Sequence, residues 1–202
     1  MKTALRRWHK WLGWLLAAQL LLWAVTGAVF IFKPGYGPAY ERLEVLFLPV
    51  SQQDIQRVAA IAKPEWQGVR ILRSVAGEHL LVNTVNGVKH LDFSGVQRNP
   101  SASVVKSLFS DSIAGNTARY GQLTDLAGLT AVTSTGVNLT LDWQQLTLRQ
   151  QGDDSRLISL LYKLHYLQFT GNAFIDKTMA SLALMFLIVL SVFGVVVSFL
   201  RK

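Results

Sequence analysis

The chain of 202 residues contains no cysteine. This absence excludes a disulfide framework, a Cys-ligated iron–sulfur cluster, a zinc ribbon and a covalently attached c-type haem. Any domain that the chain forms must therefore be stable through its apolar core alone. The sequence also lacks a Gly-rich phosphate loop, a dinucleotide-binding fingerprint and a nucleophile elbow. Oxidation of NADH or a flavin would therefore need a partner protein, and no hydrolytic site is recognised.

Charged residues are missing from two long stretches, 11–32 and 179–200. About 20 apolar residues at 1.5 Å rise cross a hydrocarbon core of ~30 Å, so each stretch predicts a transmembrane helix. A cleaved signal peptide is the alternative for the first stretch, because residues 1–7 resemble a charged n-region. The stretch is longer than a signal-peptide h-region and has no small-x-small exit, which favours an uncleaved anchor.

The formal net charge of +8 is concentrated beside these two stretches. This distribution argues against nucleic-acid binding, since the region between the stretches mixes both signs nearly evenly. The positive-inside rule instead places both termini in the cytoplasm and residues of about 33–171 outside. The basic residues at the two ends are Lys2, Arg6, Arg7, Lys10, Arg201 and Lys202.

Residues 34–100 predict one helix packed on a small antiparallel sheet. Ser51 is expected to cap the helix, whose buried face is expected to comprise Ile55, Val58, Ala59 and Ala62. Asn86-Gly87 is a strong signal for a two-residue hairpin. The expected strands are 68–75, 79–85 and 88–93.

Residues 101–152 show a weaker version of the same pattern. A second α/β module is favoured here over additional strands of the first domain. Residues 111–128 are rich in Gly, Thr and Asn and are expected to form a long loop, either functional or mobile. The expected elements are a helix at 103–110 and strands at 129–135, 137–143 and 146–150.

Residues 153–171 predict an amphipathic helix that runs to about Phe169 and lies along the outer membrane surface. Its apolar face is expected to comprise Leu157, Leu160, Leu161, Leu164 and His165. The fold class that follows is an α+β membrane protein. Transmembrane helices within 1–33 and 172–202 flank the modules 34–100 and 101–152.

Three motifs carry a resemblance to a known family. Residues 7–13 read Arg-Trp-His-Lys-Trp-Leu-Gly before a Leu-rich span, residues 164–171 read Leu-His-Tyr-Leu-Gln-Phe-Thr-Gly, and residues 51–93 form the helix-and-strand unit. Together they resemble the PepSY-associated transmembrane family. Gln168 stands where that family's Leu-His-x-x-Asp-Phe-x-Gly motif has an acidic residue, which puts any role of that carboxylate in doubt.

The resemblance implies a bacterial inner-membrane protein with a periplasmic PepSY domain. Larger, four-span relatives include ferric-siderophore reductases that pass electrons through b-type haems held by histidines. Other PepSY domains are regulatory or inhibitory partners of peptidases. Whether this chain is the electron-transfer component of such a reductase is left open by the sequence.

The four histidines fall into two classes. His79 and His90 lie in expected strands and are interpreted as surface or edge residues. His9 and His165 lie at opposite membrane boundaries on apolar helix faces, and imidazole is the usual ligand of non-covalent haem. We interpret them as candidate axial ligands of haem b, although histidines among lipid headgroups are the ordinary alternative.

His9 and His165 cannot share one iron within a monomer, since the ~30 Å hydrocarbon core separates them. A homodimer with a two-fold axis along the membrane normal would pair each histidine with its symmetry mate and hold two haems. A different subunit supplying the second ligand is the alternative. Gly13 and Ala17, and Gly194 in the second span, would let porphyrin or a partner helix approach, or serve helix packing alone.

The leading functional hypothesis is therefore a dimeric b-haem protein in the lipid bilayer. It would pass electrons from a cytoplasmic or membrane donor to a periplasmic acceptor such as a ferric chelate. The alternative is a membrane-tethered PepSY module that binds or regulates a periplasmic protein and has no redox role. Neither hypothesis involves nucleic acid.

Overall fold

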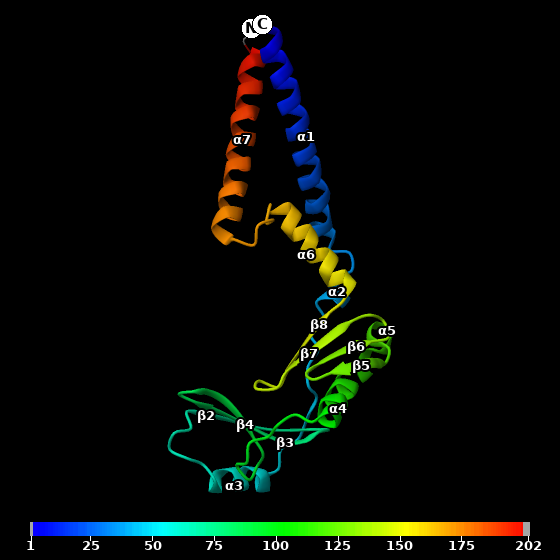
Figure 1. The fold of residues 1–202 in the computed structure, drawn as a ribbon, viewed down its shortest axis with the longest axis vertical. Coiled ribbons are helices and arrows are strands. Elements are labelled where there is room, and N and C mark those ends of the chain that lie inside the picture. Colours follow the sequence, from blue (N-terminus) through cyan, green and yellow to red (C-terminus); the bar gives the residue numbers. More distant parts are fainter. Residues whose placement is uncertain (1, 200–202) are drawn as a thin grey trace. The chain divides into compact units, whose positions relative to one another are not determined.

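The computed structural model describes the backbone of residues 2–199 and the side-chain surroundings of residues 11–192. The chain divides into two compact units, which are described separately (Figure 1). Residues 1–36 and 155–202 form the helical unit, and residues 37–154 form the sheet unit.

The helical unit comprises α1 (Lys2–Phe32), most of α6 (Asp153–His165) and α7 (Ala173–Phe199). Two segments are long and apolar enough to cross a membrane, Trp11–Phe32 in α1 and Ala173–Val192 in α7. Very little of either segment is buried within the chain. Helices that are apolar on all sides and unburied are suited to lipid surroundings rather than to water.

α6 ends at His165, about four residues earlier than the sequence led us to expect. Leu167 adopts a left-handed φ of 53°. The Gln168 N–H donates to the Lys163 carbonyl and the Leu167 N–H to the Leu164 carbonyl, at 2.8 and 3.4 Å. These two bonds form a Schellman motif. The helix end was missed because glycine usually occupies the left-handed position of this motif.

The first half of the sheet unit begins after α2 (Tyr36–Ala39). α3 (Gln52–Ala60) precedes a four-stranded antiparallel sheet of order β1-β2-β3-β4. Ser51 caps α3 as expected, and its capping box is completed by Asp54. The expected hairpin is present, but its two-residue loop is Val85-Asn86, one residue earlier than predicted, because Gly87 pairs with Thr84 and begins β4. Only Val58 of the expected apolar face of α3 is buried, and Ile55 is 51% exposed. The strands are β1 (Phe47–Leu48), β2 (Gly68–Ser74), β3 (Gly77–Thr84) and β4 (Gly87–Leu91).

The second half repeats this arrangement, with α4 (Ala102–Ile113) preceding an antiparallel sheet of order β5-β6-β7-β8. The prediction of a long loop at residues 111–128 is wrong. α4 extends to Ile113, a 3-10 turn η1 (Ala114–Asn116) and a short helix α5 (Thr117–Tyr120) follow, and the first strand of this sheet lies within the expected loop. The strands are β5 (Leu123–Ala127), β6 (Thr130–Thr133), β7 (Asn138–Asp142) and β8 (Thr147–Gln151).

Local hydrogen bonds and burial explain why residues 114–121 are ordered. Asn116 caps α5 by accepting from the Arg119 N–H, and the Tyr120 side chain is fully buried. Gly121 then takes a φ of 61°, where an added Cβ would lie 2.1 Å from the Ser134 hydroxyl oxygen. The polar composition of this segment therefore reflects caps and tight turns rather than mobility.

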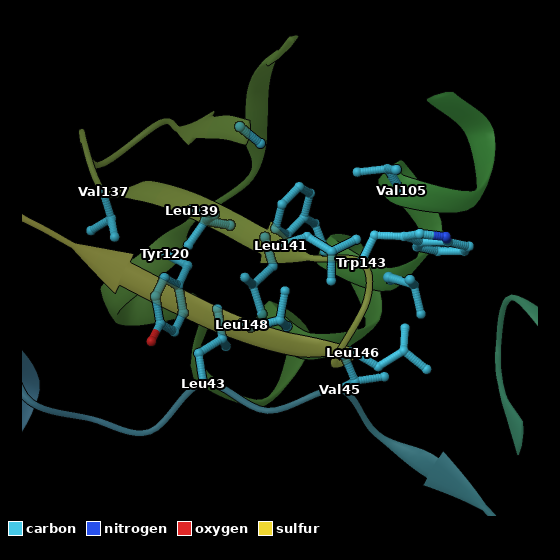
Figure 2. Packing of buried hydrophobic residues seen from close by; sticks show 14 of the residues in the cluster. Leu43, Val45, Val105, Tyr120, Val137, Leu139, Leu141, Trp143, Leu146 and Leu148 are labelled. Atoms are coloured by element: carbon cyan, nitrogen blue, oxygen red, sulfur yellow. The ribbon is translucent and has the colours of Figure 1, made fainter. Parts of the chain in front are cut away.

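β3 is buried on both of its faces. Leu80 and Val82 pack toward α3 with Phe93, whereas Leu81 joins the larger cluster that covers the second sheet. Figure 2 shows Leu43 and Val45, which precede β1, packed against the side chains of this larger cluster. The two halves of the sheet unit thus share apolar contacts through β3 and the segment before β1.

The two ends of the sheet unit are tied to each other. Gln150 Nε2 donates to the carbonyl oxygens of Ala39 and Glu41 at 3.0 and 3.2 Å. Arg119 Nη1 donates to Asp154 Oδ2 at 2.8 Å, and its Nη2 donates to Gln150 Oε1 at 2.7 Å. The chain therefore enters and leaves this unit at adjacent points.

Candidate functional site

His165 is the last residue of α6 and lies against α1 within the helical unit. Its carbonyl is one of those left without an intrahelical partner at a helix end, and Trp23 Nε1 donates to it at 2.8 Å. The ring makes edge contacts with Phe30 and Tyr166, with centroids 5.1 and 5.0 Å away. Trp23 and Phe30 are both residues of the first candidate span.

Thr26 connects His165 to the backbone of α1. Thr26 is 1% exposed, and its hydroxyl lies 2.7 Å from the Leu22 carbonyl oxygen and 2.7 Å from His165 Nδ1. When the hydroxyl donates to the Leu22 carbonyl, it accepts from His165 Nδ1–H, and Nε2 then keeps its lone pair.

His165 Nε2 makes no hydrogen bond with a described residue. An imidazole with one nitrogen tied to a polar neighbour and the other free is the usual form of a metal-bound histidine. An imidazole with its Nε2 lone pair available could hold a haem iron. The side chain of His165 is only half-buried, so it remains accessible to a group outside the chain.

The level of His165 in the span follows from its contact with Thr26. At 1.5 Å rise per residue, Thr26 lies roughly 9 Å along α1 from Phe32 and roughly 26 Å from residue 9. Residues 9 and 26 therefore lie at different levels along α1.

The remaining residues of the expected haem site are not brought together with His165. Gly13 and Ala17 are exposed on α1, and a side chain added at Gly13 would meet no atom of a described residue within 4 Å. His9 and Gly194 fall in α1 and α7 at positions that lie outside the residues whose side-chain surroundings are described.

His79 and His90 are buried, which corrects their interpretation as surface or edge residues. They are 0% and 2% exposed. His90 pairs with Leu81 across β3 and β4 and shares the face of His79, and its ring stacks on Trp143, with centroids 4.2 Å apart. The signal that was missed is the unbroken apolar run after His79, since a strand buried on both faces lacks polar alternation.

The two rings form a directed hydrogen-bond chain. His90 Nδ1 must donate to the Trp143 carbonyl at 2.8 Å, which leaves His90 Nε2 to accept from His79 Nδ1 at 2.9 Å. His79 Nε2 then accepts from the Ser74 hydroxyl at 2.7 Å. All four ring nitrogens are satisfied while both rings are neutral.

Burial and a nearby cation hold both rings neutral. Burial lowers the pKa of His79 to about 3, helped by the charges of Arg98 and His90. Burial lowers the pKa of His90 to about 4, against the opposing effect of the Trp143 carbonyl. Arg98 donates to the Ala76 and Glu78 carbonyls. Its Nη1 lies 3.3 Å from His79 Nδ1, but both nitrogens carry hydrogens, so this contact only opposes protonation.

The histidine pair is therefore a structural link rather than a ligand set. It joins β4 of the first sheet to the residue that follows β7 of the second. In the part of the chain whose side chains are described, no group of three or more His, Asp or Glu side chains could hold a metal ion. His165 is the described histidine whose geometry suits an external ligand.

Comparison with known proteins gives one result for the whole chain. Neither the curated proteins nor the solved structures compared with the chain give a match. The family model of the PepSY-associated TM region matches residues 6–202. This range includes both candidate spans and the complete sheet unit between them. The chain therefore belongs to the PepSY-associated TM family and is a membrane protein with a PepSY domain.

Proposed function

We propose that this protein is a dimeric membrane cytochrome that passes electrons from a cytoplasmic or membrane donor to a periplasmic acceptor such as a ferric chelate. It lies in a bacterial inner membrane with both termini in the cytoplasm and the sheet unit in the periplasm. The observation that carries the proposal is His165, whose Nδ1 lies 2.7 Å from the buried Thr26 hydroxyl and whose Nε2 makes no hydrogen bond with a described residue.

Three residues of α1 hold His165 in position. Thr26 contacts the ring at Nδ1, Trp23 anchors the backbone of His165, and Phe30 supports one side of the ring. A b-type haem bound between two such histidines supplies one-electron chemistry at the outer side of the membrane. Since a single chain offers one histidine at this level, a second copy supplies the other.

His9 is proposed to serve in the same way near the cytoplasmic face, again paired with its copy. The exposed face of α1 that carries Gly13 and Ala17 supports the approach of porphyrin or a partner helix, and Gly194 is proposed for the same role in α7. The dimer then holds two haems at two levels of the membrane. It uses two chains to build the four-span arrangement of larger relatives.

The test is the visible spectrum of the protein purified in mild detergent from haem-sufficient cells, before and after reduction with dithionite. We expect a sharp reduced α-band and about one haem per chain, as two bis-histidine sites in a dimer require. A colourless preparation would overturn the proposal.

Two variants assign the outer haem. His165→Ala should halve the haem content while the protein remains inserted in the membrane. Thr26→Val removes only the hydroxyl and should weaken outer haem retention about 10- to 100-fold, the usual effect of losing the partner of a ligating histidine. Thr26→Ser keeps the hydroxyl and serves as the matched control, with wild-type retention expected.

A second candidate function is supported by the edge of the first sheet. β1 is a two-residue edge strand, and Leu46, Phe47 and Leu48 are each 43–55% exposed there. Exposed apolar edge strands are suited to pairing with an added strand of a partner protein. A colourless protein whose periplasmic cross-links disappear in Leu46→Asp and Leu48→Asp variants would establish a tethered binding module instead.

A further inference from the structure

A second groove in the helical unit lies between the C-terminal end of α6 and the start of α7. Its volume is about 660 Å³. It combines apolar side chains with two lysines from different helices, Lys163 of α6 and Lys177 of α7. The full lining is Leu160, Lys163, Leu164, Gln168, Phe169, Thr170, Gly171, Ala173, Asp176 and Lys177.

Neither lysine of this groove is neutralised within the chain. Both side chains are exposed, and neither forms an ion pair with a described residue. The one carboxylate in the lining, Asp176, is committed to the loop before α7. Its Oδ1 accepts from the Thr170 N–H at 3.0 Å and from the Thr170 hydroxyl at 2.8 Å. The groove therefore has a net positive charge.

Three of the first four backbone N–H groups of α7, those of Phe174, Ile175 and Asp176, are already occupied. Asn172 Oδ1 accepts from Phe174 N–H at 3.0 Å and from Ile175 N–H at 3.4 Å. The Asp176 N–H donates to the Asn172 carbonyl at 2.9 Å. An anion in this groove would therefore be bound by the two ammonium groups rather than by the helix end.

The groove lies where the second span begins, because Ala173 is its first residue. Its apolar walls include Leu160 and Phe169, which are 52% and 55% exposed. Phe174, next along α7, is 79% exposed. A ligand that suits this surface has an anionic head beside the lysines and an apolar body beside the walls.

We propose that the groove between α6 and α7 binds the head group of an anionic phospholipid through Lys163 and Lys177, with the acyl chains against Leu160 and Phe169. Basic pockets at the ends of membrane spans are suited to such head groups. A zwitterionic lipid also carries a phosphate, but its cationic group would meet the same lysines. The site therefore selects by head-group charge.

The test is native mass spectrometry of the full-length protein exchanged into detergent with phosphatidylglycerol or with phosphatidylcholine. We expect one tightly retained phosphatidylglycerol per chain, preferred over phosphatidylcholine about 30-fold. This ratio corresponds to about 2 kcal/mol, from about 1 kcal/mol for each lysine near the lipid surface. The Lys163→Gln/Lys177→Gln variant should lose this preference.

The matched control is Lys89→Gln/Lys106→Gln, which removes two exposed charges from the sheet unit. It should retain phosphatidylglycerol as the wild type does. Equal retention of the two lipids by the wild type, or wild-type retention by the Lys163/Lys177 variant, would overturn the proposal. Displacement of the lipid by millimolar inorganic phosphate would also overturn it, since the site would then recognise a free anion.

Discussion

The two described histidine environments of this protein differ in the number of ring nitrogens that the chain itself satisfies. In the sheet unit, His79 and His90 use all four of their ring nitrogens in one chain of hydrogen bonds. In the helical unit, His165 Nδ1 contacts Thr26, and Nε2 makes no hydrogen bond with the residues described there. The comparison teaches that burial alone does not identify a ligand. The most buried histidines are the ones with no lone pair to offer.

The largest effect expected to distinguish the two histidine environments is the loss of stability of the sheet unit at acidic pH. His79 and His90 have folded pKa values of about 3 and about 4, against about 6.5 when unfolded. Their contribution to stability is therefore present above pH 6.5 and is lost as the pH falls below it. Below pH 6.5, each histidine lowers the free energy of unfolding by about 1.4 kcal/mol per pH unit. The sheet unit should therefore lose up to about 4 kcal/mol of stability between pH 7 and pH 5.

Hydrogen exchange measured by mass spectrometry on the full-length protein checks this loss, after correction for the intrinsic exchange rate at each pH. The opening free energy of β3 and β4 amides should fall steeply with acid. The α1 peptide that contains Thr26 should show no comparable slope. Equal slopes in both regions would contradict the assignment of the buried pair as the acid-sensitive element.

A smaller loss is expected from His90→Ala. It leaves the Trp143 carbonyl and the His79 Nδ1–H without partners in a buried site and opens a cavity beside the Trp143 ring. The free energy of unfolding of the sheet unit should fall by about 3 kcal/mol. Urea titration of the exchange-protected β3 amides measures this change. His165→Ala is the comparison variant, and a similar loss from it would erase the distinction between the two environments.

The smallest effect concerns the tautomer of His165. In the protein without added haem, long-range 15N NMR should show His165 protonated at Nδ1. Thr26→Val removes an acceptor worth about 1 kcal/mol and should move the tautomer ratio about fivefold toward Nε2–H. Thr26→Ser should leave the ratio unchanged. An Nε2-protonated ring in the wild type would remove the basis for calling His165 a preformed ligand.

Several elements of the fold could be predicted because their signals are local. Asn86-Gly87 indicated the hairpin of β3 and β4, although the loop is Val85-Asn86, and Ser51 indicated the start of α3. The charge-free stretches predicted the two candidate spans through length and composition. None of these predictions required knowledge of distant contacts.

The predictions that failed depended on contacts far apart in the sequence. His90 is buried because the carbonyl of Trp143 and its ring meet it from the second sheet. The early end of α6 failed for a local reason instead, because it depends on a left-handed Leu167, a conformation that most non-glycine residues avoid. For the candidate site, the sequence indicated His165 but not Thr26, since nothing local links residues on two different helices.

The tied ends of the sheet unit have a consequence for how this protein family can vary. Gln150 holds the exit of the unit beside its entry at Ala39 and Glu41. A module whose two ends are adjacent can be inserted, exchanged or enlarged without changing the segments on either side of it. Evolution can therefore replace the sheet unit of such a protein while its pair of apolar helices stays the same.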